Sequence, residues 1–201
     1  MSLTPKDGKD IRQDISAYVR SSIAVKSTLE DQSSEIAAII DKLEQVARVG
    51  GTIYSCGNGG SACDSIHLTE ELVARYQIER PGIRAHHFQD PGILTCWSND
   101  YEFAGVFERQ VKTMLNAADA LVAITTSGNS ENILRAIKAA NELGATTIAL
   151  LGKGGGKAKS LAKHSLVVKS DITSHVQEAH ITVIHVICDQ LERRLFASES
   201  L

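Results

Sequence analysis

The hydrophobic pattern of the chain changes near residue 50. Before it, apolar residues recur at spacings of three and four, the period of an amphipathic helix. They form two runs: Ile11, Ile15, Tyr18, Val19 and Ile23, and then Ile36, Ile39, Ile40 and Leu43. Polar residues 31–34 separate the runs. The first fifty residues are therefore predicted to form two helices.

After Gly50 and Gly51, short apolar runs alternate with helical patterns. Strands are predicted over residues 52–56, 83–88, 120–125, 146–151 and 166–168, and helices over 61–76, 103–115, 131–143, 157–162 and 174–195. Strands that are apolar on both faces and alternate with helices indicate a parallel sheet covered on both sides. We predict an α/β fold: a five-stranded parallel sheet flanked by helices, in a single domain with an N-terminal helical extension.

Composition narrows the class of protein. The 201 residues are 43% hydrophobic and 22% charged, as in an ordinary globular chain. A net charge of −3 gives no global field for DNA or an anionic membrane, so an anionic ligand needs a local site. The four cysteines form no CxxC pair, and neither a signal peptide nor a membrane-spanning run is visible. We expect a cytoplasmic protein that binds neither nucleic acid nor membrane.

Two predicted loops have an unusual composition, and both follow strands, where open α/β sheets bind ligands. Residues 56–61 read CGNGGS, and such glycines let the backbone approach an anion at a helix N-terminus. Taken alone, this loop is equally consistent with a tight strand-to-helix turn. Residues 125–130 read TTSGNS, with four hydroxyls before a helix whose N-cap needs one. The surplus indicates phosphate oxygens, and the missing Walker lysine disfavours a nucleoside triphosphate.

A dinucleotide-binding Rossmann fold is a competing interpretation of the first loop. The spacing Gly57-x-Gly59-x-x-Ala62 fits its fingerprint. Asp90 could supply the required acidic residue, although it lies later than the usual interval of about 20 residues. This interpretation leaves the hydroxyl-rich loop unexplained, and we favour it less.

Ionisable residues in two predicted helices are candidates for chemistry. His67, Glu71 and Arg75 share one helix face at i, i+4 spacing. Such a ladder is usually solvated, but its face begins about two turns, roughly 9 Å, from the first loop. In the last helix, His185 stands among apolar residues 183, 184, 186 and 187. A lone histidine there is more often a satisfied core residue than a catalyst, unless other site residues lie near it.

In combination these motifs are far more specific. The run SCGNGGSACDSIHLTEELVARY at 55–76, Asn99-Asp100, TSGNS at 126–130, and QEAH at 177–180 followed by His185 together resemble the phosphoheptose isomerases of the sugar-isomerase (SIS) domain group. The resemblance spans nearly the whole chain. It implies conversion of sedoheptulose 7-phosphate to D-glycero-D-manno-heptose 7-phosphate, the opening step toward the heptose of bacterial lipopolysaccharide or related glycans. It also implies a homotetramer that binds zinc, as several family members do.

The resemblance also assigns roles to residues. Glu71 corresponds to the catalytic base and His185 to the acid. The substrate-contacting positions are Asn58, Gly59, Gly60, Ser61, Glu71, Asn99, Asp100, Thr125, Thr126, Ser127, Ser130 and Gln177. The positions of the metal ligands, for one zinc per subunit, are His67, Glu71, Gln177 and His185. From the residues themselves, we expect the wide apolar faces of the helices within 1–50 to make oligomer contacts, and 51–201 to form the SIS domain that binds the sugar phosphate.

Some positions depart from the family pattern. Thr125 stands where Ser is common, and Ala62 replaces a frequent His. Ser174 and His175 replace the acidic and Arg residues often found before Gln177, which leaves the identity of the sugar open. Eight residues, about 12 Å of continuous helix, separate Gln177 from His185. Either the last helix starts after Gln177, or the metal ligands come from two chains.

The predicted groups suit the implied reaction. Ketose to aldose conversion moves a proton between adjacent carbons through an enediol, and it needs a base beside the carbon and an acid or metal beside the oxygen. Histidine, glutamate and glutamine donors suit zinc. Two alternatives stay open: an isomerase of another sugar phosphate, and a non-catalytic SIS protein of the replication-initiator-associating kind. Those binding proteins typically lack both the helix carboxylate and the final histidine, so Glu71 and His185 favour an enzyme.

Overall fold

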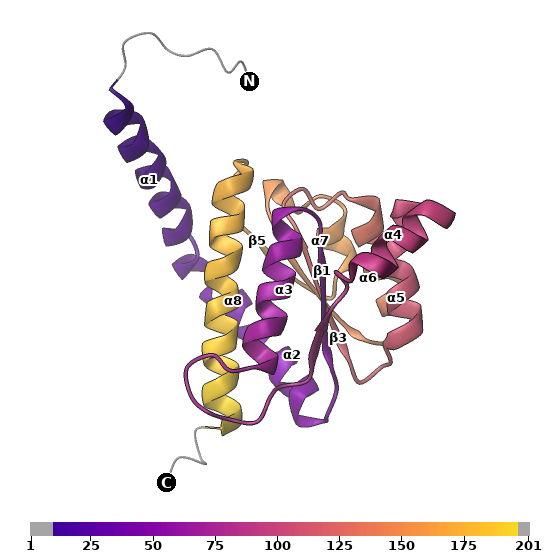
Figure 1. Ribbon diagram of the computed structural model, residues 1–201. Coiled ribbons are helices and arrows are strands. Elements are labelled where there is room, and N and C mark those ends of the chain that lie inside the picture. The colour runs from indigo at the N-terminus through magenta and orange to yellow at the C-terminus, as the bar shows by residue number, and fades with distance from the viewer. Residues whose placement is uncertain (1–9, 197–201) are drawn as a thin grey trace.

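A five-stranded parallel sheet forms the centre of the computed structural model, which describes residues 10–196 (Figure 1). Its strands are β1 (Ile53–Gly57), β2 (Ala85–His87), β3 (Ala120–Thr125), β4 (Thr146–Leu151) and β5 (His164–Val167). They lie in the order β2-β1-β3-β4-β5, and every neighbouring pair is parallel. In a sheet of this order, strands are added on one side of β1 and then on the other, so the strand order reverses between β1 and β3, where a ligand crevice is expected.

The strand predictions are confirmed, each to within two residues at either end. The sheet order differs from the 3-2-1-4-5-6 order of the dinucleotide-binding Rossmann fold. Asp90 also has a structural role, because its Oδ1 accepts a hydrogen bond of 2.8 Å from the backbone N–H of Ile93 and caps a helix. The structure therefore gives the dinucleotide interpretation no support.

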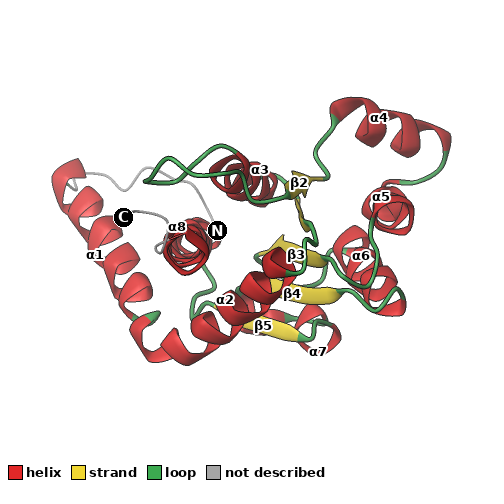
Figure 2. Ribbon diagram, turned by 90° about the horizontal axis from the view of Figure 1, so that it is seen from below, coloured by secondary structure: helices red, strands yellow, loops and turns green. Residues whose placement is uncertain are grey.

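Helices cover both faces of the sheet (Figure 2). One hydrophobic core lies between the sheet and α2, α3 and α8, and a second lies between the other face of the sheet and α5, α6 and α7. Alternate residues of β3 enter the two cores, so that Val122 faces the first and Ala123 the second. The α-helices are α1 (Ile11–Ser27), α2 (Ser33–Arg48), α3 (Gly60–Val73), α4 (Pro91–Asp100), α5 (Val106–Met114), α6 (Glu131–Glu142), α7 (Ala158–Leu161) and α8 (Thr173–Phe196), with short 3₁₀ turns at Glu30–Gln32, Phe103–Gly105 and Lys153–Gly155.

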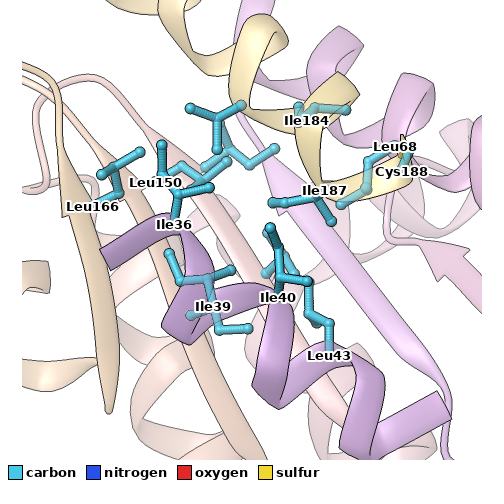
Figure 3. Close-up of a cluster of buried hydrophobic side chains, with 14 of the residues drawn as sticks. Ile36, Ile39, Ile40, Leu43, Leu68, Leu150, Leu166, Ile184, Ile187 and Cys188 are labelled. Carbon is cyan, nitrogen blue, oxygen red and sulfur yellow. The ribbon is translucent and has the colours of Figure 1, made fainter. Parts of the chain in front are cut away.

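The second N-terminal helix belongs to the core. Ile36, Ile39, Ile40 and Leu43 of α2 are buried and pack toward α8 and the sheet (Figure 3). These are the residues whose spacing predicted the helix, so their periodicity reports burial within this chain. Removing a buried Ile or Leu side chain of this kind typically costs about 2–5 kcal/mol of stability.

The first N-terminal helix is different, because its apolar stripe is not covered. Ile11, Ile15, Val19 and Ile23 are between 49% and 70% exposed, and α1 stands away from the body of the molecule (Figure 1). Its junction with α8 is polar: the Tyr18 hydroxyl donates to Ser174 Oγ and to a Glu178 carboxylate oxygen at 2.9 and 3.0 Å. Over residues 10–196, no helix combines the length and the hydropathy needed to cross a membrane.

One helix was not predicted. In α4, Asp90 is the N-cap and Pro91 occupies the first turn, which are ordinary helix-start signals. None of its ten residues is fully buried, and its contact with the core is limited to the partly buried Leu94 and Trp97. Asn99 and Asp100, for which no element was predicted, form its C-terminal end.

Candidate active site

A cavity of about 270 Å³ lies beyond the carboxyl ends of β1 and β3. Both loops singled out in the sequence contribute to it, together with the first turn of α8. Its lining residues are Asn58, Gly59, Gly60, Ser61, Ile124, Thr125, Thr126, Ser127, Ser130, Thr173 and Gln177. The structure therefore brings together nine of the twelve predicted substrate-binding residues, namely all except Glu71, Asn99 and Asp100.

Glycines shape the first wall of the cavity. Gly59 has φ of +57°, a conformation that favours glycine. A Cβ atom on Gly60 would lie 2.3 Å from the Gln177 Nε2 atom, so a glycine here lets that side chain approach the start of α3. The N-terminus of a helix offers unpaired N–H groups and a positive dipole end. This wall therefore suits an anion such as a phosphate.

The second wall carries the hydroxyls. Thr125 Oγ1 accepts a bond from the Gly128 N–H, and Ser127 Oγ accepts one from the Asn129 N–H, which shapes the loop. Ser130 occupies the N-cap position of α6, yet its side chain makes no capping hydrogen bond. The Ser130 hydroxyl is therefore not used for capping, and it is available to a ligand in the cavity that Ser130 lines.

An asparagine that was missed in the sequence joins the two walls. Asn132 is only 3% exposed, and its side-chain amide exchanges two hydrogen bonds of 2.9 Å with that of Asn58. Asn132 shares the buried face of α6 with Ala136 and Ala139. A polar residue at a position of this apolar face was the signal that could have revealed it.

A second group of residues lies where α3 and α8 run side by side (Figure 1). His67 Nε2 is 3.2 Å from Glu71 Oε1 and 3.2 Å from His185 Nε2. All three residues are partly buried. His185 is therefore in contact with other site residues and is not a satisfied core histidine. Arg75, the next residue of the predicted ladder, is exposed.

The donor atoms of this group fit a metal ion. One ligand atom each from His67, Glu71 and His185 lies within 4.8 Å of the others. Two facing imidazole nitrogens cannot both donate to each other, so at least one presents a lone pair. Two imidazoles and a carboxylate are a donor set that zinc accepts. The structure thus contains a possible three-residue metal site.

Asp64 is a further ionisable group beside this cluster, and it was missed in the sequence. Its Oδ2 is buried without a hydrogen-bond partner. Burial raises the pKa of Asp64 to about 6, and the nearby His67 offsets part of the rise. Perturbed carboxyls of this kind gather at functional sites. The i, i+3 spacing to His67 was the available signal, since it puts both residues on one face of α3.

The cavity and the cluster occupy different parts of one chain. Helix α8 begins before Gln177 and runs unbroken past His185, so the alternative in which the helix starts after Gln177 is wrong. Along α3, ten residues, or about 15 Å, separate Ser61 from Glu71, more than the two turns that reach His67. Gln177 lies at the cavity, and His185 lies at the cluster.

Two predicted residues join neither group within one chain. Asn99 and Asp100 are exposed at the end of α4, where the Asn99 amide donates to an Asp100 carboxylate oxygen at 2.9 Å. They do not line the cavity. Their assignment to substrate binding stays a prediction.

The sheet order and the hydroxyl-lined cavity at its switch point define an α/β protein with a candidate site for an anionic ligand. The SIS domain family model matches residues 17–152, and the chain belongs to this family. A phosphoheptose isomerase of Akkermansia muciniphila is 41% identical over 190 residues, which cover 90% of this chain and 99% of that protein.

Solved structures agree with that assignment. A phosphoheptose isomerase structure from Neisseria gonorrhoeae has a TM-score of 0.86 at 34% identity and covers 91% of this chain and 99% of its own. One from Francisella tularensis has a TM-score of 0.88 at 33% identity and covers 92% and 100%. Within the SIS proteins, this chain is a member of the phosphoheptose isomerase family.

Proposed function

We propose that this chain isomerises sedoheptulose 7-phosphate to D-glycero-D-manno-heptose 7-phosphate. The observation that carries the proposal is the meeting of Glu71 and His185 at His67, on the two helices whose N-terminal ends border the cavity. The relatives that match most of this chain are named phosphoheptose isomerases, which supports both the reaction and the substrate. In this proposal the protein is a cytoplasmic enzyme that supplies a heptose precursor for lipopolysaccharide or related glycans.

In the proposed aldose–ketose isomerisation, different residues bind the phosphate and transfer the protons. Hydroxyls of Ser127 and Ser130, with the start of α3, bind the phosphate and orient the sugar. The Glu71 carboxylate removes a proton from C1 of the ketose, while His185 gives a proton to the oxygen at C2, and an enediol forms. Glu71 then returns its proton to C2, and the hydroxyl at C1 loses its proton to His185. The products are the aldose and the original protonation states of both residues.

We propose zinc as the cofactor, one ion per subunit. His67, Glu71 and His185 would hold it through one ligand atom each, which leaves the second carboxylate oxygen of Glu71 and the second ring nitrogen of His185 for the proton transfers, and Gln177 would be a fourth donor. When bound, zinc would polarise the carbonyl of the substrate. Gln177 lies about 12 Å along α8 from His185, so the Gln177 donor would come from a second copy of the chain.

The proposal therefore includes a homo-oligomer, most simply the tetramer implied by the family resemblance. Two observations support it. The apolar stripe of α1 is exposed in the single chain. The cavity and the cluster are also separated along α3 and α8, and a second copy that brings its cluster to this cavity would join them.

The alternatives can be weighed against particular residues. His175, one of the two departures that left the sugar open, is 2% exposed and packs edge-on against Tyr18, with ring centroids 4.6 Å apart. Ser174 accepts from the Tyr18 hydroxyl. Neither residue lines the cavity, so these departures give no reason within one chain to choose another sugar phosphate. The assembled Glu71 and His185 disfavour a non-catalytic binding protein.

An isomerase assay tests the proposal. Purified protein of measured zinc content is offered a panel of ketose phosphates, and sedoheptulose 7-phosphate is expected to yield the aldose. Glu71→Gln keeps the shape of the side chain but removes the proton acceptor, so its rate should fall by about two to four orders of magnitude. Glu70→Gln, which changes an exposed carboxylate on the same helix, is the matched control and should keep the wild-type rate. Near wild-type turnover by Glu71→Gln would contradict the mechanism.

A further inference from the structure

A buried ion pair that the mechanism does not use lies beside the Glu71 and His185 cluster. Arg80 is in the loop that follows α3, and Glu192 is near the end of α8. Arg80 Nε donates to Glu192 Oε2 at 3.1 Å, and the two residues are 7% and 3% exposed. Charged residues this deeply buried require full pairing.

The Glu192 carboxylate fixes the chain that leaves α3. It accepts three backbone N–H groups, from Tyr76, Gln77 and Ile78, at 3.1, 2.9 and 3.0 Å, in addition to Arg80. Burial by itself would raise the pKa of Glu192, but these N–H groups and Arg80 outweigh it and lower the pKa. The carboxylate is therefore charged at neutral pH and holds four donors.

The Arg80 guanidinium caps the end of α3. Its Nη2 donates to the backbone carbonyl of Glu71 at 2.8 Å, and its Nη1 donates to that of Leu72 at 2.8 Å. The last carbonyls of a helix have no partner within the helix. Arg80 thus binds the main chain of the residue whose side chain is the proposed base.

The same pair is connected to His185. Glu192 follows His185 by seven residues, which is two turns on one face of α8. Tyr76, whose N–H is bound by Glu192, has its ring 6.0 Å from the His185 ring. One ion pair therefore contacts the main chain of the proposed base and the aromatic neighbour of the proposed acid.

A stabilising role alone does not explain this pair, because replacing buried ion pairs by apolar residues is often neutral or stabilising. A displacement of about 1 Å, in contrast, can cost catalysis about a hundredfold. We propose that Arg80 and Glu192 are positioning residues. They hold the end of α3 against α8 so that the Glu71 and His185 side chains can both reach the same substrate molecule. This inference rests on the proposed isomerase function.

Glu192→Gln is the test variant. The amide keeps the shape and one acceptor oxygen. Its NH₂ group is itself a donor, however, and would replace the oxygen that accepts from the Tyr76 N–H and from Arg80 Nε. We expect kcat to fall about 10- to 100-fold. KM should stay within about twofold, because the cavity lies at the opposite end of both helices. The control is Asp189→Asn, which breaks the surface pair with Arg193 on the same helix and should change neither constant.

A spectroscopic measurement gives a readout that does not depend on turnover. In ¹H–¹⁵N spectra of the imidazoles, the signals of His67 and His185 should shift in Glu192→Gln, while that of His164 in β5 should not. Wild-type protein without isomerase activity would refute the proposed function. An active wild type with unshifted signals and an unchanged kcat in Glu192→Gln would refute the positioning role.

Arg80→Lys provides a second variant should Glu192→Gln not fold. The ammonium keeps the charge, but it cannot span Glu192 and two carbonyls as the guanidinium fork does. The same loss of kcat at constant KM, with shifted His67 and His185 signals, is expected. A wild-type kcat in a folded Arg80→Lys would overturn the inference.

Discussion

At the scale of single residues, the hydroxyls of the second cavity wall make a direct prediction. Ser127→Ala combined with Ser130→Ala should raise KM for the sugar phosphate at least tenfold, since hydrogen bonds to a charged group are worth about 1.5–3 kcal/mol each. Binding of the unphosphorylated sugar should hardly change. Thr113→Ala on α5, whose hydroxyl bonds to a helix carbonyl, is the control. Equal affinity of the wild type for phosphorylated and unphosphorylated sugar would remove the basis of the assignment.

Another prediction at this scale concerns His180. Its Nε2 bonds to the Leu151 carbonyl at 3.1 Å, so this nitrogen carries the proton, and its Nδ1 is buried without a partner. The folded protein therefore holds a neutral ring. Burial lowers the pKa of His180 to about 4, and the bond to Leu151 opposes the shift only in part.

The sign of the pH effect follows. The unfolded chain takes up this proton below about pH 6.5, and the folded chain takes it up only below about pH 4. The free energy of unfolding therefore does not depend on His180 above about pH 6.5. It falls as the pH drops from 6.5 to 4, and the full loss below both pKa values is about 3 kcal/mol. Urea melts between about pH 7 and pH 4 should show a weaker pH dependence for His180→Gln than for the wild type. Identical slopes would contradict this account.

How well the site residues could be predicted depended on the kind of signal each one carried. The glycines and hydroxyls were visible because an excess of them follows predicted strands. Asn132 and Asp64 were not, because what distinguishes them depends on their surroundings: Asn132 pairs with the Asn58 amide, and the Asp64 Oδ2 atom is buried without a partner. A single sequence does not report such partners.

At the scale of elements, the strands were predictable because parallel strands buried on both faces are nearly continuous apolar runs. Helix α4 was not predicted because it is short and none of its residues is fully buried, so its apolar pattern is weak. The side-by-side packing of α3 and α8 was also out of reach, since it joins segments more than a hundred residues apart. Glu71 and His185 were each selected from the sequence, but their meeting within one chain, and the separation of Gln177 from them, required the structure.

At the scale of the whole molecule, the exposed stripe of α1 predicts assembly. Light scattering should show an oligomer, most simply a tetramer. Ile15→Asp places a charge in the stripe and should yield smaller species with reduced activity, whereas Gln13→Asp, at an exposed polar position of the same helix, should not. A wild-type monomer with full activity at assay concentration would rule the assembly out as a requirement.

Mixing variants refines the same prediction. Glu71 and His185 meet within one chain, so mixing Glu71→Gln chains with His185→Ala chains should not rebuild a site. Mixing Glu71→Gln chains with Gln177→Ala chains should restore some activity, because Gln177 from one chain would then meet an intact cluster from the other.

The unbroken course of α8 has a consequence for how this chain can vary in length. Gln177, His185 and Glu192 share one helix without an irregular residue between them. Inserting or deleting a single residue between Gln177 and His185 would rotate one against the other by about 100° and shift it by about 1.5 Å. Side-chain rotation could not correct such a change of phase, because Gln177 lines the cavity while His185 contacts His67 of α3. Changes in length that evolution tolerates must therefore fall outside this stretch, in the loops that no helical period constrains.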